Sequence, residues 1–240
     1  KESGPEFTVF SQVIAEIESY GGLALGKTTT KAVWSRYLSA EDGAEAPPAV
    51  VVWTSFDPET GKIRKGKKTK LVYAGPFEYA ALYKFLVRES QPVVLRLPER
   101  EGPDFQKRQQ LAQQSGFAKL FVFHPKDKDA SEALMTAALA LKPNVITYHY
   151  LVNNDEEDEG FHVMGQFGIK YNDLGEHGAA MMYQGQGLEV YKGDMTDAAA
   201  LQKFGEEFVE AQGEFVPAPS EGGAKGKSKG KKKKSKKSEM

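Results

Sequence analysis

The segment GGLALGKT, residues 21–28, fits the phosphate-loop pattern G-x-x-x-x-G-K-[ST], which binds nucleotide phosphates. Such a loop needs a strand before it and a helix after it, because the loop amides and the helix N-terminus then face the anion. The preceding residues predict a helix instead, since their apolar side chains recur at helical spacing from Phe7 to Tyr20. The sequence therefore favours a helix that ends at Gly21 or Gly22 and leads into a short strand, with a nucleotide-binding loop as the alternative.

The remaining candidates for catalysis or metal binding are weak. The chain contains no cysteine, which excludes thiol nucleophiles, dithiol redox chemistry and cysteine-ligated zinc. Its four histidines include no i, i+4 pair; they are His124, His149, His162 and His177. The acidic run at residues 155–159 lacks the ligand alternation and the glycine of an EF-hand loop, so a solvated acidic turn is favoured over a weak calcium site. We expect no metal, no cofactor and no enzymatic activity.

Charge is distributed unevenly along the chain. The net charge of −1 combines residues 221–240, with nine Lys and two Glu, and the other 220 residues, with 23 basic and 31 acidic side chains. The Lys-rich end has almost no apolar residue to bury, so residues 217–240 are predicted to be disordered. Lys225–Lys237 could contact the acidic body of the protein, or dock an anionic partner such as nucleic acid, lipid or an acidic protein. No apolar run reaches the roughly 20 residues that a membrane-spanning helix needs.

Two stretches of the chain each predict a pair of strands followed by a helix. Their elements are strands 49–56 and 70–75 and helix 76–90 in the first stretch, and strands 179–184 and 188–193 and helix 197–212 in the second. Both second strands end in Tyr-x-Gly, at Tyr73–Gly75 and Tyr191–Gly193, and each is followed at a similar interval by a phenylalanine, Phe85 or Phe204. From residue 93 the full predicted order is βαβαβαββα. We therefore expect two copies of one domain.

This order, with the segments KLFVFHPK, VITYHY and VYKGDMTDAAALQKFGEEF, resembles the non-catalytic (b/b′-type) thioredoxin-like domains of the protein disulfide isomerase family. The resemblance implies an α/β fold of tandem thioredoxin-like domains, each with a central mixed sheet flanked by helices. The first domain, residues 1–90, would be incomplete at its N-terminal side. The second, residues 91–216, would be complete, and residues 217–240 would form the disordered Lys-rich tail.

The resemblance also implies where sites would lie. Catalytic members carry redox cysteines after the second strand; that place holds His124, which we expect at the surface or at a helix cap. The family's cis-proline before the fourth strand is replaced by His177 and Gly178. Non-catalytic members hold unfolded polypeptide in an apolar groove between the sheet and its helices. By position, that groove would involve Phe121, Phe123, Leu134, His149 and Leu151, and ordinary core is the alternative for each.

The function implied by the resemblance is that of a redox-inactive chaperone or scaffold that binds unfolded polypeptide or a protein partner. The endoplasmic reticulum lumen is the expected compartment, and a cytoplasmic or nuclear location stays open. The alternative is an interaction protein whose basic tail docks an anionic partner, with the folded part as a spacer.

Overall fold

The computed structural model describes residues 4–19, 28, 30, 32, 35–36, 38, 48–54, 56–57, 67–97, 105–125, 132–174 and 178–219. The predictions for residues 20–27, for His177 and for Lys225–Lys237 lie outside these ranges.

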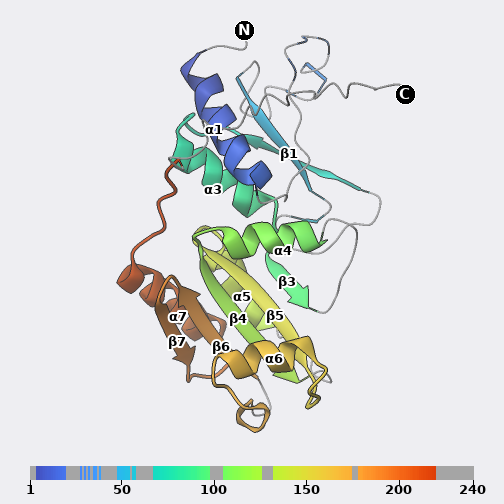
Figure 1. Ribbon diagram of the computed structural model, residues 1–240, viewed down its shortest axis with the longest axis vertical. Helices are drawn as coiled ribbons and strands as arrows, with labels where there is room; N and C mark the ends of the chain where they lie inside the picture. Colours follow the sequence, from blue (N-terminus) through green and yellow to red (C-terminus); the bar gives the residue numbers. More distant parts are fainter. Residues whose placement is uncertain are drawn as a thin grey trace, which may run out of the picture.

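A five-stranded mixed sheet, with the strand order β3-β5-β4-β6-β7, organises the larger part of the molecule (Figure 1). Its strands are β3 (Val94–Leu97), β4 (Ala118–Pro125), β5 (Val145–Val152), β6 (Ala179–Gln184) and β7 (Gly187–Tyr191). β3, β5 and β4 run parallel, whereas β6 is antiparallel to β4 and β7 is antiparallel to β6. The predicted α/β fold with a central mixed sheet flanked by helices is confirmed, and the strand order is compatible with a thioredoxin-like fold.

Helices cover both faces of this sheet. They are α4 (Phe105–Gln114), α5 (Glu132–Leu141), α6 (Glu159–Gln166) and α7 (Ala198–Gln212), with a short 3-10 helix η2 (Tyr171–Asp173) before β6. α4 and α6 pack on one face, where Leu111 and Met164 are buried. α5 and α7 pack on the other, where Leu134 and Leu201 are buried. Because both faces are covered, nearly every residue of β4 and β5 is buried.

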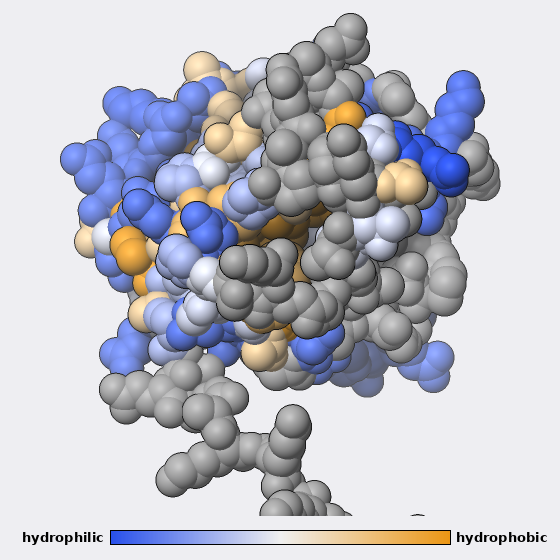
Figure 2. Space-filling model, turned by 90° about the horizontal axis from the view of Figure 1, so that it is seen from above, coloured by the Kyte–Doolittle hydropathy of each residue, from blue (hydrophilic) through white to orange (hydrophobic). Residues whose placement is uncertain are grey.

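The N-terminal part of the molecule is a two-stranded sheet with two helices. Its elements are α1 (Pro5–Ser19), β1 (Val50–Thr54), β2 (Thr69–Tyr73) and α3 (Tyr79–Glu89). β1 and β2 are antiparallel, and α1 contacts α3 directly. Figure 2 looks onto this end of the molecule: apolar residues lie toward the centre of the face and hydrophilic residues around its margin.

The hairpins β1-β2 and β6-β7 share a detailed arrangement at their Tyr-x-Gly ends. The hydroxyl of Tyr73 donates to the carbonyl of Pro76 at 2.5 Å, and that of Tyr191 donates to the carbonyl of Asp194 at 3.1 Å. The Tyr73 ring lies 5.0 Å from the ring of Phe85, and the Tyr191 ring lies 5.1 Å from its counterpart in α7. A Cβ on the glycine of either motif would overlap the tyrosine ring, so the folded-back ring requires glycine.

The two hairpin-helix units nevertheless differ in their surroundings. α1 packs on α3, whereas α6 and α7, the corresponding helices of the second unit, lie on opposite faces of the sheet. One hydrophobic cluster contains Val13 and Leu82 of the N-terminal part together with Tyr148 and Met164 of the sheet part. The buried core therefore continues across residue 90, where the sequence predicted a domain boundary.

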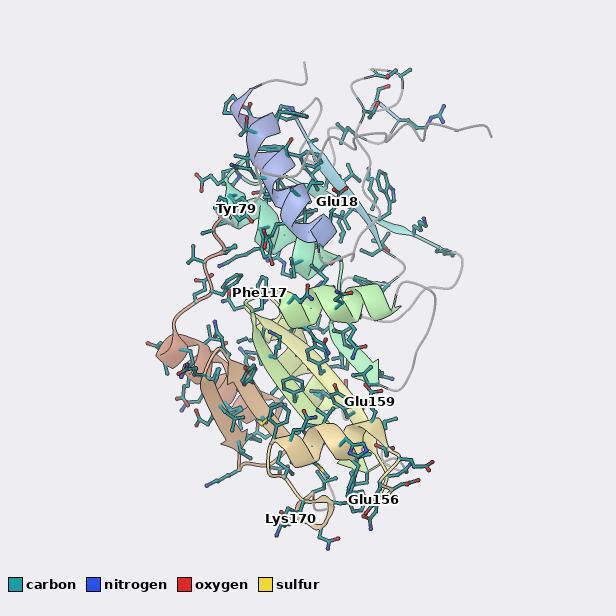
Figure 3. The ribbon with its side chains drawn as sticks, viewed as in Figure 1. Glu18, Tyr79, Phe117, Glu156, Glu159 and Lys170 are labelled. Carbon is teal, nitrogen blue, oxygen red and sulfur yellow. The ribbon has the colours of Figure 1, made fainter. Side chains whose placement is uncertain are left out.

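Residues 213–219, here called the return segment, run from the end of α7 back to the N-terminal part (Figure 1). The ring of Phe215 lies 6.2 Å from Tyr83 of α3 and 5.7 Å from Phe117, which precedes β4. Figure 3 shows Phe117 at the level where the two parts of the molecule meet. Phe215 is half-buried and Pro217 is buried, while Val216 between them is exposed. The return segment thus connects both parts through alternate side chains.

Candidate functional site

The five residues predicted to line a groove lie on two different surfaces of the sheet part. Phe121 and Phe123 belong to the cluster under α4 and α6. Leu134 lies in α5 and belongs to the cluster on the opposite face. His149 pairs in register with Val122 of that second cluster, and Leu151 follows it on the same side of β5. The structure therefore brings the two phenylalanines together and places the other three residues on the far side of the sheet.

An aromatic cluster lies around Phe121 on the face between α4 and α6. Its six members are Phe121, Phe123, Tyr148, Tyr150, Phe167 and Tyr183. The Phe121 ring stacks on Tyr148 with 5.0 Å between centroids and lies 5.2 Å from Phe167. Phe121, Phe167 and Tyr183 are only half-buried. Half-buried rings in contact with one another form an apolar surface that a partner can cover.

Tyr148 brings an unsatisfied polar atom to this cluster. The residue is buried, and its hydroxyl has no hydrogen-bond partner among the described residues. Burial, and to a smaller extent Tyr150, raises the pKa of Tyr148, so the hydroxyl stays protonated and able to donate. Leaving a buried hydroxyl without a partner is costly, and because this one is shielded from solvent it offers no contact on the surface of the cluster.

Sequence reasoning found two members of the aromatic cluster and missed four. Tyr148 and Tyr150 alternate along β5 with the same period as Phe121 and Phe123 along β4, so strand periodicity could have placed them on one face. Phe167 follows α6, outside any strand, and only the tertiary structure places it beside Phe121.

Two buried histidines form a pair on the opposite face of the sheet. Nδ1 of His124 lies 3.0 Å from Nε2 of His149, and the two rings meet edge to face. The prediction that His124 lies at the surface or at a helix cap is wrong: the side chain is 3% exposed, because the parallel register of β4 and β5 brings it beside His149.

His149 is held neutral by its surroundings. Burial, then His124, then Arg96 of the neighbouring strand β3 lower the pKa of His149 from 6.5 to about 3. In a bond between two imidazoles one nitrogen donates and the other accepts, which both neutral rings can do. The described residues contain no group of three or more His, Cys, Asp or Glu side chains that could hold a metal ion. The geometry of the pair is that of a buried hydrogen bond.

Gly178 packs directly against the end of β4, beside the histidine pair. Its φ is +85°, and a Cβ there would overlap the carbonyl oxygen of Phe123 and approach His124 Cδ2 to 2.9 Å. Only glycine allows the chain to pass so close to the histidine pair in this conformation.

The acidic run before α6 is an exposed turn, as predicted. Asp155 accepts a hydrogen bond from the amide of Glu157 at 2.9 Å, and Asp158 caps α6 by accepting from the amide of Phe161 at 3.0 Å. Glu156 and Glu159 lie near the start of α6 (Figure 3). The acidic side chains therefore serve turn and helix formation.

Comparisons with known proteins add no assignment: no protein-family model matches this chain, and no curated protein matches it. Within the described ranges, no helix is long and apolar enough to cross a lipid bilayer.

Proposed function

We propose that this chain is a redox-inactive, thioredoxin-like protein of the disulfide isomerase type, which binds unfolded polypeptide or a protein partner and acts as a chaperone or scaffold. The observation that carries the proposal is the half-buried aromatic cluster around Phe121. The strand order β3-β5-β4-β6-β7 and the repeated hairpin-helix unit support the tandem thioredoxin-like assignment. The absence of cysteine from the sequence supports a binding role in place of dithiol chemistry.

The aromatic cluster suits an extended apolar segment of a client. Rings of Phe121, Phe167 and Tyr183 offer faces and edges to apolar or aromatic side chains, and each such contact is weak enough to be released. Several such contacts give an affinity in the micromolar range, which is appropriate for transient capture. The lumen of the endoplasmic reticulum is the compartment we propose for this activity.

An amide chemical-shift titration with an unfolded, aromatic-rich peptide at physiological salt tests the proposal. Phe167→Ala should weaken binding about fivefold, since it removes one ring at the half-buried margin of the cluster. Leu139→Ala is the matched control, because Leu139 is an exposed apolar residue of α5, which covers the opposite face of the sheet. Absence of any binding at tens of micromolar, or equal loss in both variants, would remove the proposal.

The second candidate is docking of an anionic partner through Lys225–Lys237, favoured by the nine lysines in residues 221–240. Affinity for such a partner should fall steeply with salt concentration and vanish when residues 221–240 are deleted. Binding of an apolar client to the aromatic cluster should survive the same deletion.

A further inference from the structure

A second candidate site, separate from the aromatic cluster, lies in the N-terminal part. It is a groove of about 420 Å³ between β2 and α3, lined by residues 72–75 and by Ala81, Lys84, Phe85 and Arg88. No lining residue comes from β1, and among the described residues β2 pairs only with β1. The groove therefore follows the outer edge of β2, where an extended chain finds backbone donors and acceptors.

Two cations stand one helical turn apart on the α3 side of this groove. Lys84 and Arg88 are separated by four residues, so their side chains leave the same face of α3. Both are partly withdrawn from solvent, with 20% and 33% of the side chain exposed. Like charges at this spacing repel one another. A negative group placed near both cations offsets this repulsion.

Each cation already has one carboxylate partner, and each has further hydrogen-bond donors beyond the one that this partner uses. Lys84 forms an ion pair with Glu214 of the return segment. Arg88 donates through Nε to Glu89 at 2.7 Å, and no hydrogen bond or ion pair joins its two terminal nitrogens to another described residue. A guanidinium can bind one carboxylate through Nε and another through its terminal nitrogens, and an ammonium has three donors. An incoming carboxylate would therefore add to the present contacts without having to replace them.

The second hairpin-helix unit provides an internal comparison. Alignment of Phe85 with Phe204 places Lys84 on Lys203 and Arg88 on Glu207. In α7 the lysine and the glutamate form an i, i+4 ion pair at 3.7 Å, and their side chains are 73% and 66% exposed. The two positions pair with each other in α7, whereas in α3 both are cations and each takes its carboxylate partner from elsewhere. The hairpin-helix structure that the two units share does not require this difference in side-chain charge.

We infer that the groove between β2 and α3 binds an acidic peptide segment. The peptide lies extended beside β2, with one carboxylate against Arg88 and Lys84 and an apolar side chain on Phe85 and Ala81. The further donors of Arg88 and Lys84 select the acidic residue, and the ring of Phe85, which lies 5.0 Å from that of Tyr73, supplies an apolar surface. The outer edge of β2, which pairs with no other described strand, selects an extended conformation over a helical one.

The test is an amide chemical-shift titration of the full chain with a short peptide of alternating Glu and Val at about 0.15 M salt. The peptide should shift the amides of residues 72–75 and of Arg88. The charge-conserving double variant Arg88→Glu with Glu207→Arg should weaken this binding at least about tenfold, since it converts the groove into the self-neutralised arrangement of α7 and leaves net charge unchanged. Arg88→Gln serves as a second variant should the double variant fail to fold, with a smaller loss expected.

The outcomes separate this site from the others on the chain. Shifts at residues 72–75 that disappear in the double variant support the inference, whether or not aromatic-rich peptides bind the aromatic cluster. Shifts confined to Lys225–Lys237 would mean that the acidic peptide only meets the basic tail, and they would overturn it. Unchanged affinity in both the double variant and Arg88→Gln would overturn it equally.

Discussion

The histidine pair makes the stability of the protein sensitive to acid, and His149 is responsible. Its pKa is about 3 in the folded protein and 6.5 when the chain is unfolded, because burial, His124 and Arg96 all oppose its protonation. Between these two values the unfolded state takes up the proton and the folded state does not. Stability is therefore fully present above pH 6.5 and is lost as pH falls toward 3.

We predict that the free energy of unfolding falls by about 1.5 kcal/mol between pH 6.5 and pH 5 because of His149 alone. His149→Gln should remove this contribution, since glutamine can still bond to His124 but does not titrate. Urea unfolding at a series of pH values measures it. The control is His162→Gln, which replaces an exposed imidazole of α6 by the same amide side chain. An identical slope in wild type and His149→Gln would show that the pair does not exclude the proton.

Gly178 provides a second prediction about a single residue. Gly178→Ala should destabilise the fold by about 3 kcal/mol, because the new methyl group is both in a left-handed conformation and in contact with Phe123 and His124. Gly168→Ala isolates the first effect: its φ is +73° and nothing lies within 4 Å of its Cβ position, so about 1 kcal/mol is expected. Thermal unfolding of both variants provides the comparison, and equal losses would show that the steric contact is absent.

At the level of elements, the two Tyr-x-Gly turns should contribute equally to stability. Tyr73→Phe and Tyr191→Phe each remove one hydroxyl-to-carbonyl hydrogen bond and keep the ring, so each should cost about 1 kcal/mol. Tyr171→Phe in η2 is the control, with a change expected within about 0.5 kcal/mol. Denaturant unfolding measures all three. A large loss of stability in one variant and none in the other would show that the two turns do not contribute equally, despite their similar geometry.

Element order and strand faces could be predicted from the sequence, whereas the contacts between distant elements could not. The Tyr-x-Gly motif was visible because its hydrogen bond and its ring contact involve residues within one turn and one helix. The pairing of His124 with His149 depends on the register of two parallel strands, which local periodicity does not fix. The packing of α1 on α3 and the position of Phe167 likewise depend on tertiary contacts that leave no local signal.

At the level of the whole molecule, the return segment holds the N-terminal part against the sheet part. Phe215→Ala removes the ring that touches Tyr83 and Phe117, and it should lower the free energy of unfolding by about 3 kcal/mol. Hydrogen exchange should show that the amides of β1 and β2 lose protection more than those of β4 and β5. Val216→Ala is the control: its side chain is 69% exposed, so little change is expected. Uniform loss of protection would mean that the two parts unfold as one unit.

The ion pair between Lys84 and Glu214 joins residues 130 positions apart. A ribosome delivers α3 long before it delivers the return segment, and chains are synthesised at about 5–20 residues per second. The surface of α3 that carries Tyr83 and Lys84 is therefore synthesised several seconds before the return segment that packs against it. A nascent chain halted before Phe215 would leave that surface exposed and available to chaperones.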